Sequence, residues 1–189
     1  RPTLAFLDRA VGARRSFRLL DVGFGDGDML RQIAKWAARK GIPAELVGVD
    51  LNPNSVAAAM EVTPAKLPIT YVAGDYADLA GQRFDCIISS LVAHHMTRGQ
   101  LVDFLSFMDR EAAAGWLVND LHRHGLAYLG WPVLAWLMRW HQIVKHDGHL
   151  SIARSYRPQE WPELLDEAGV SGGRVYRAFP FRLCVEGLK

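Results

Sequence analysis

The side chains best suited to chemistry in this sequence are carboxylates placed around a run of glycines. The run lies in residues 19–28, LLDVGFGDGD, where an apolar strand pattern gives way to a helical one. Glycines at such a turn allow tight backbone geometry and the close approach of a ligand. The glycines are Gly23, Gly25 and Gly27, and the nearby carboxylates are Asp21, Asp26 and Asp28. Their negative charge favours a ligand with a cationic end over one that presents a pyrophosphate.

The spacing of these glycines argues against two common nucleotide-binding loops. The dinucleotide fingerprint needs its third glycine five positions after the first, and Asp28 occupies that position here. A carboxylate there would repel a pyrophosphate, so a dinucleotide oxidoreductase is disfavoured. A Walker A loop is excluded because no Gly-Lys-Ser/Thr sequence follows the glycines.

Two later carboxylates stand at the ends of predicted strands. Asp50 ends the run VGVD, where a carboxylate can accept hydrogen bonds from both hydroxyls of a ribose. Asp75, in the run AGDY, is placed to accept from an adenine amino group, and Tyr76 offers an apolar face beside it. Each has a simpler alternative, because Asp50 alone suits a helix cap and Gly-Asp suits a turn. Their order after the acidic glycine loop favours ligand contacts.

Two pairs of histidines follow the next two predicted strands, His94 with His95 and His122 with His124. Both pairs are expected at the carboxyl edge of a parallel sheet, where ligands bind in open α/β folds. Histidine titrates near neutrality, so it suits the removal of a proton from a phenol or an enol. We predict His122 and His95 as catalytic residues, and His94 and His124 as substrate contacts.

The preferred base among them is His122. Asp120 and Arg123 stand beside it in the sequence and are expected to tune or orient its ring. His95 has the alternative of packing against the helix that follows. Each histidine taken alone also has a purely structural interpretation.

The sequence does not favour a metal site at the histidines or a nucleophilic role for the cysteines. The histidines between the fifth strand and the last helix include no helix-spaced pair with a carboxylate ligand, so we predict no metal site. These are His122, His124, His141, His146 and His149. Cys86 and Cys184 lie within predicted strands, and we expect both to be buried, free thiols.

Short apolar runs alternate with helical periodicity along the chain, which predicts a parallel sheet covered by helices. Asn52 with Pro53 predicts a helix start, as does the capping box of Thr97 with Gln100. Helices are also expected over residues 28–40 and 158–168. The expected strands cover residues 18–22, 45–49, 69–73, 84–89, 116–119, 175–179 and 183–186.

The irregular part of the chain is residues 121–156. It holds a stretch rich in Leu, Trp and Ala that is too short to span a bilayer, which takes about 20 residues. We interpret it as a helical lid over a hydrophobic substrate pocket, with Trp131 and Trp136 as substrate contacts. A packed core helix and a membrane-surface helix are the alternatives.

The three acidic elements, in this order and spacing, resemble the class I S-adenosylmethionine-dependent methyltransferase family. The resemblance implies a Rossmann-like, doubly wound α/β fold with seven strands ordered 3-2-1-4-5-7-6 and strand 7 antiparallel. It implies S-adenosyl-L-methionine as cofactor and S-adenosyl-L-homocysteine as product. By the family pattern the three glycines approach the methionine part, Asp50 the ribose and Asp75 the adenine. We further expect the cofactor pocket to include Asp21, Leu51, Tyr76 and Ser90.

The acceptor is expected to be a small, largely apolar molecule. After the fourth strand the chain has no Asn/Asp-Pro-Pro-aromatic motif, and neither cysteine follows a proline, so the signatures of nucleic-acid methylation are missing. Residues 119–124 and 146–148 resemble, more weakly, a bacterial subgroup associated with polyketide-type or quinone-type acceptors. We expect O-methylation of such a phenol or quinol. The alternatives are C- or N-methylation, and a non-catalytic module that binds the cofactor.

Size and composition are those of one soluble domain. The chain has 189 residues, half of them hydrophobic, and a net charge of +2 without a long basic run. It shows no signal peptide, so we expect a cytoplasmic protein without nucleic-acid partners or stable membrane insertion. It begins at Arg1 rather than Met, and we expect an N-terminal piece to be missing. In most members of the family a helical segment before the first strand helps to close the cofactor pocket, and residues 2–13 are left to do so here.

Overall fold

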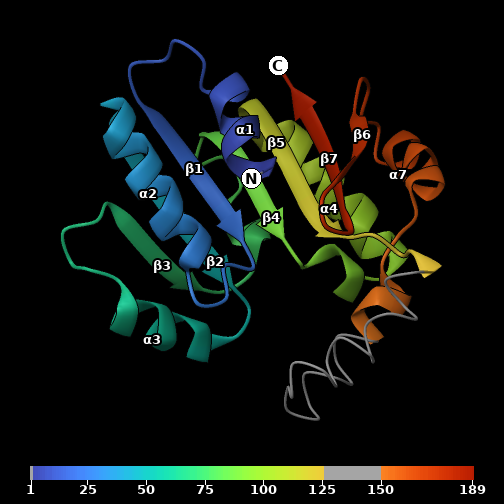
Figure 1. Ribbon diagram of the computed structural model, residues 1–189, viewed down its shortest axis with the longest axis horizontal. Helices are drawn as coiled ribbons and strands as arrows, with labels where there is room; N and C mark the ends of the chain where they lie inside the picture. Colours follow the sequence, from blue (N-terminus) through green and yellow to red (C-terminus); the bar gives the residue numbers. More distant parts are fainter. Residues whose placement is uncertain (1, 126–149) are drawn as a thin grey trace.

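The computed structural model describes residues 2–125 and 150–189. Its centre is a seven-stranded sheet in the order β3-β2-β1-β4-β5-β7-β6, with β7 antiparallel to both of its neighbours (Figure 1). The predicted fold class and strand order are thereby confirmed. The strands are β1 Phe17–Val22, β2 Ala44–Asp50, β3 Ile69–Ala73, β4 Phe84–Ser90, β5 Ala112–Leu121, β6 Arg174–Ala178 and β7 Arg182–Leu188.

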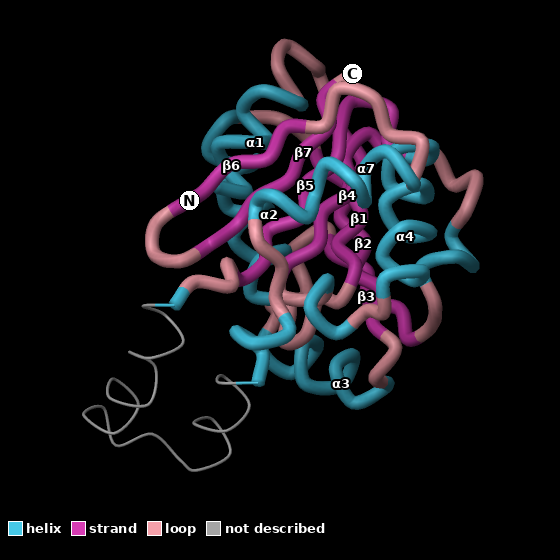
Figure 2. Tube along the Cα trace, turned by 90° about the vertical axis from the view of Figure 1, so that its right-hand side faces the viewer, coloured by secondary structure: helices cyan, strands magenta, loops and turns pink. Residues whose placement is uncertain are grey.

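Helices cover both faces of the sheet. Side chains of α1 and α2 pack into one core cluster, and those of α4 and α7 pack into the other. Figure 2 shows the strands between α1 and α2 on one side and α4 on the other. The α-helices are α1 Pro2–Ala10, α2 Asp28–Lys40, α3 Pro53–Val62, α4 Arg98–Glu111 and α7 Trp161–Glu167, and the 3₁₀-helices are η1 Tyr76–Leu79, η2 Ala93–His95 and η3 Pro158–Glu160.

The predicted helix starts are confirmed, and one boundary is corrected. The Asn52 side chain accepts the backbone N–H of Asn54, and Thr97 forms a capping box with Gln100. The helix expected over residues 158–168 is a 3₁₀ turn followed by α7. Pro162 explains the break, because it has no N–H to donate to the carbonyl four residues earlier.

Strand β5 is longer than predicted. The residues that precede Trp116 are three alanines and Gly115, which have little strand propensity. Pairing decides their conformation, since β5 pairs with β4 from Ala112 onward and with β7 from Gly115 onward. A Cβ on Gly115 would lie 2.5 Å from the carbonyl oxygen of Gly187, so the close strand approach needs glycine there.

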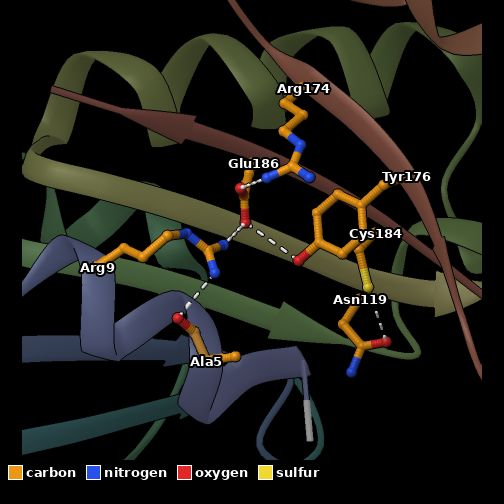
Figure 3. A network of polar contacts seen from close by, with 7 residues as sticks. All are labelled: Ala5, Arg9, Asn119, Arg174, Tyr176, Cys184 and Glu186. Atoms are coloured by element: carbon orange, nitrogen blue, oxygen red, sulfur yellow. Dashed lines mark hydrogen bonds and ion pairs between the residues drawn. The ribbon is translucent and has the colours of Figure 1, made fainter.

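A buried carboxylate ties α1 to the end of the chain. Glu186 in β7 is 2% exposed and accepts from Arg9 at 2.5 Å, from the Tyr176 hydroxyl at 3.1 Å and from Arg174 at 3.4 Å (Figure 3). Arg9 also donates to the carbonyl oxygen of Ala5 at 2.9 Å, so its guanidinium is held against the preceding turn of α1. The Glu186 carboxylate of β7 therefore links α1 and β6 to its own strand.

The two cysteines are buried, free thiols, as predicted. Cys86 lies in β4 and Cys184 in β7, with β5 between them in the sheet. The Cys184 thiol donates to the Asn119 side-chain oxygen at 3.7 Å (Figure 3). Burial raises the pKa of the Cys86 thiol to about 12 and that of Cys184 to about 11, so neither is a ready nucleophile.

Most of the predicted lid falls on residues 126–149, outside the described residues, and so do Trp131 and Trp136. At its described ends, His122 forms a bridge with Tyr156, and residues 150–154 are helical. Residues 2–13, expected to be helical, contain α1 followed by a turn. In the part of the chain that the structure covers, no helix has the length and apolar character needed to cross a membrane.

Candidate functional site

The predicted site residues that the structure describes lie at the carboxyl edge of the sheet, in the last residues of parallel strands or in the segments that follow them. The loop after β1, residues 23–27, is called the cofactor loop below. The loop after β4, residues 91–97, is called the acceptor loop. They lie side by side because β1 and β4 are neighbours, with Val22 opposite Ser89.

The three glycines of the cofactor loop all have left-handed backbone angles, with φ of 74°, 57° and 74° at Gly23, Gly25 and Gly27. A Cβ on Gly23 would strike the Val92 side chain, and one on Gly27 would strike Tyr71. Above Gly25 a Cβ would meet nothing within 4 Å. Gly23 and Gly27 thus set the shape of the loop, and Gly25 leaves backbone open to a ligand.

Asp50 closes the other side of the cofactor loop. One carboxylate oxygen accepts the N–H of Gly25 at 3.0 Å, and the other accepts the N–H of Asn52 at 2.9 Å. Each oxygen keeps a further lone pair for a ligand hydroxyl. The neighbouring Leu51 is 78% exposed, so its side chain is available to cover a flat ligand.

Asp75 and Tyr76 follow β3 and have local structural roles as well. The Asp75 carboxylate accepts the N–H of Ala77 at 2.9 Å and caps η1. The Tyr76 ring lies 4.8 Å from the rings of both Phe104 and Phe107, which holds it against α4. Burial, followed by the charges of nearby carboxylates, raises the pKa of Tyr76, so its hydroxyl stays neutral.

Asp21 and Ser90 provide the test of fit for a cationic cofactor. Asp21 is 2% exposed, and burial together with the nearby Asp50 charge raises the pKa of its carboxyl to about 8. Among the described residues, neither its Oδ1 nor the buried Ser90 hydroxyl has a hydrogen-bond partner. Buried polar atoms are normally paired, so these two are open for a ligand. A ligand with an ammonium group and a sulfonium fits a site that has a buried carboxyl oxygen without a hydrogen-bond donor among the described residues.

The histidines of the acceptor loop differ in environment. His94 is buried at 6% exposure, and its ring Nδ1 lies 2.7 Å from the carboxylate of Asp120 at the end of β5. His95 is exposed, and its ring lies 4.1 Å from that of His94. Partial desolvation of the ring is the main cause that lowers the pKa of His95, and the neighbouring His94 lowers it further. The imidazole of His95 is therefore unprotonated near neutral pH.

The histidines after β5 lie beside the β6–β7 hairpin. The backbone N–H of His122 donates to the carbonyl oxygen of Phe181 at 2.9 Å. The His124 ring lies 5.3 Å from that of His122 and 5.6 Å from that of Phe181. Burial, followed by the charges of Arg177 and His124, lowers the pKa of His122. It too is unprotonated near neutral pH.

The sequence argument for preferring His122 is wrong in one respect. Asp120 does not orient the His122 ring, because its carboxylate is bonded to His94. Arg123 is paired with Glu160. The partner of Asp120 comes from the loop after the adjacent strand β4, so proximity in sequence did not identify it.

Sequence reasoning named Asp120 but assigned it to His122 instead of His94, and it missed Phe181. Asp120 carries the signal of an acid at the end of a central strand, beside the strand that leads to the histidine pair. Phe181 carries none, because only the antiparallel return of β7 brings the hairpin to this edge. In the described ranges, no group of three or more His, Cys, Asp or Glu side chains is arranged to hold a metal ion.

Comparison with known proteins agrees with this geometry. A family model described as a methyltransferase domain matches residues 19–115, just over half of the chain. That range contains all three acidic elements and the histidine pair of the acceptor loop. Among curated proteins, none matches the chain by sequence.

Solved methyltransferases share the fold at low sequence identity. The plantazolicin methyltransferase BpumL, solved with S-adenosylhomocysteine, has a TM-score of 0.69 at 14% identity, over 92% of this chain and 76% of its own. A methyltransferase from Aquifex aeolicus has a TM-score of 0.66 at 19% identity, over 98% and 87%. The magnesium protoporphyrin IX methyltransferase from Synechocystis PCC 6803 has 0.66 at 18% identity, over 100% and 80%.

The family match and the acidic, glycine-rich edge of the sheet agree on the same activity. The chain belongs to the methyltransferase domain family and is an S-adenosylmethionine-dependent methyltransferase.

Proposed function

We propose that this enzyme methylates a hydroxyl oxygen of a small, largely apolar acceptor, of the phenolic, polyketide-like or quinol-like kind. The observation that carries the proposal is the placement of histidines at the carboxyl edge of the sheet. His94 and His95 follow β4, which adjoins the strand of the cofactor loop, and His122 and His124 follow β5. A phenol has a pKa of about 10 and is mostly neutral near pH 7, so it gains from a nearby base. His95 and His122 are the candidates, because burial lowers the pKa of both.

The cofactor is proposed to bind across the cofactor loop and the ends of β2 and β3. When bound, S-adenosylmethionine supplies an electrophilic methyl group on a sulfonium. Asp21 receives its ammonium group, Asp50 its ribose hydroxyls and Asp75 its adenine amino group. Gly25 allows the ligand to approach the backbone. Leu51 and Tyr76 lie beside the position proposed for the adenine ring. Ser90 offers its buried hydroxyl at the boundary of the two loops.

The chain itself contributes alignment and proton removal. The cofactor loop and the acceptor loop are in contact at Gly23 and Val92. This contact fixes the distance between the loop proposed to bind the cofactor and the loop proposed to bind the acceptor. Correct alignment of two reactants accounts for much of the rate in such a transfer. An imidazole within hydrogen-bond distance of the acceptor hydroxyl would then take its proton. His94 and His124 are proposed as further contacts for the acceptor.

The test is a methyl-transfer assay on phenols that differ only in the reacting group. Each phenol or quinol is paired with its methyl ether and its aniline counterpart, and transfer of labelled methyl is followed by mass spectrometry. We expect transfer to the hydroxyl compounds alone. Transfer to the anilines, or to a ring carbon, would establish N- or C-methylation instead. Tight cofactor binding with no transfer to any phenol would contradict the proposal and favour a non-catalytic binding module.

A further inference from the structure

The two histidines of η2 are neighbours in sequence but differ in their surroundings. His94 is almost fully buried, whereas His95 is exposed at the edge where the acceptor is expected. Their rings are in contact, with centroids 4.1 Å apart and planes inclined by 40°. The buried His94 ring thus supports the exposed His95 ring. The contacts that hold His94 therefore also determine the position of His95.

A single carboxylate holds the buried histidine in two ways. Asp120 Oδ2 accepts the backbone N–H of His94 at 2.9 Å, and its Oδ1 lies 2.7 Å from the ring Nδ1 of the same residue. Oδ1 also accepts the N–H of Leu121 at 2.6 Å, which fixes the carboxylate relative to β5. Because Asp120 is 3% exposed, water does not compete for these bonds.

The rest of the acceptor loop is held between β5 and the cofactor loop. Leu91 has a φ of 62°, a backbone conformation that costs energy in a residue with a side chain, and its N–H donates to the Asn119 carbonyl at 3.1 Å. Val92 packs against Gly23 of the cofactor loop. The His95 N–H then donates to the Val92 carbonyl at 2.9 Å. His95 is therefore only three residues from a contact with the cofactor loop.

We infer that Asp120, acting through His94, is a positioning residue that holds His95 as the base for the acceptor hydroxyl. This inference rests on the proposed O-methylation. In the step, the acceptor O–H bond breaks and its proton goes to a ring nitrogen of His95. The oxygen electron pair forms the new bond to the methyl carbon as the bond from that carbon to sulfur breaks. His95 is then the catalytic residue, and His94 and Asp120 act through it.

Among the described residues, the charged and titratable groups that shift the pKa of His95 come from three elements. His94 adjoins it on η2, Asp120 lies at the end of β5, and Arg154 lies in the helical residues 150–154. Asp120 raises the pKa of His95, while His94 and Arg154 lower it. Removal of the Asp120 charge should therefore lower the pKa of His95, and removal of the His94 ring should raise it.

The test measures His95 directly and needs no acceptor. The histidine ring signals of the wild-type protein, loaded with S-adenosylhomocysteine, are titrated by NMR, and His95 is identified as the signal lost in His95→Gln. In Asp120→Asn the titration midpoint of His95 should move to lower pH. In His94→Gln, whose amide can still donate to Asp120, it should move to higher pH. Asp166→Asn, the same chemical change at an exposed position on α7, should leave it unchanged.

Activity on an accepted phenol supplies the second readout. His95→Gln should lower kcat by roughly 10²–10⁴-fold, and Asp120→Asn by roughly 10-fold to 100-fold, with little change in KM for the cofactor. An unchanged His95 titration in both Asp120→Asn and His94→Gln would overturn the positioning role, whatever the acceptor is. Full activity of His95→Gln would overturn the catalytic role. If no phenol is methylated but the titration shifts as stated, the proposed function fails while the coupling of Asp120 and His94 to His95 stands.

Discussion

Two carboxylates of this enzyme are equally buried, yet their surroundings differ. Glu186 and Asp21 are each 2% exposed. Glu186 receives donors from Arg9, Arg174 and Tyr176, so its charge is fully compensated within the fold (Figure 3). Asp21 has an oxygen without a hydrogen-bond partner among the described residues, and its carboxyl has a raised pKa. The compensated carboxylate is a structural brace, and the uncompensated one is our proposed contact for the cofactor's ammonium group.

Position in the fold explains the contrast. Glu186 lies opposite Leu117, well inside the sheet, where α1 and the neighbouring strand β6 supply donors. Asp21 lies near the end of β1, just before the cofactor loop, where a ligand can approach. Burial alone therefore does not identify a functional carboxylate, whereas burial without a partner does.

The largest expected effect concerns Asp21 and pH. A carboxyl whose folded-state pKa is raised stays protonated in the folded protein, so the stability it provides is complete below pH 3.8 and is lost as pH rises toward about 8. The ligand-free wild type should lose free energy of unfolding between pH 5 and pH 8, by at most on the order of 4 kcal/mol. Asp21→Asn should remove that loss. Urea unfolding at the two pH values measures it.

The matched control for this experiment is Asp26→Asn, at an exposed position in the cofactor loop that follows Asp21. It should keep the pH dependence of the wild type. If wild type and Asp21→Asn lose stability equally between pH 5 and pH 8, Asp21 is not the group that carries the unfavourable buried charge.

The second effect tests the brace. Glu186→Gln should lower the free energy of unfolding by about 2–3 kcal/mol, because two guanidinium groups lose their charged partner. Arg9 and Arg174 are partly exposed, which keeps the loss below that of a fully buried pair. Chemical unfolding at pH 7 measures the change. A loss no larger than that of a surface pair such as Arg14 with Asp85 would mean that the brace contributes little.

Cofactor affinity should separate the two carboxylates most clearly. Asp21→Asn and Asp50→Ala should each weaken the binding of S-adenosylhomocysteine by roughly 10-fold to 100-fold, the value of a lost charge-assisted contact of about 1.5–3 kcal/mol. Glu186→Gln should change it less than about threefold. Titration calorimetry provides the measurement. Equal weakening by all three substitutions would show that the effect on affinity comes through the fold as a whole.

The smallest expected effect is that of Tyr176→Phe. It removes one neutral donor to Glu186 and leaves both arginines in place, so the loss of stability should be about 1 kcal/mol. Cofactor affinity should not change. A loss as large as that of Glu186→Gln would show that the hydroxyl, rather than the charges, dominates the brace.

Much of the fold could be predicted because its signals are local. Helix α2 has the predicted bounds, since its apolar face and the Gly41 stop are written in consecutive residues. The capping box of Thr97 and Gln100 spans only three residues and was equally readable. The order of the strands came from resemblance to a family, through the glycine loop and the two carboxylates that follow it.

What the sequence by itself determined is therefore the set of elements, the acidic cofactor loop and the presence of histidines at one edge of the sheet. What only the tertiary structure decided is how buried charges are paired. Arg9 and Glu186 are 177 residues apart, and His94 and Asp120, on η2 and β5, are 26 apart. Such pairs depend on which strands adjoin and which face each side chain takes, and no local pattern encodes either. For that reason the sequence assigned Asp120 to its neighbour His122, while the sheet pairs it with His94.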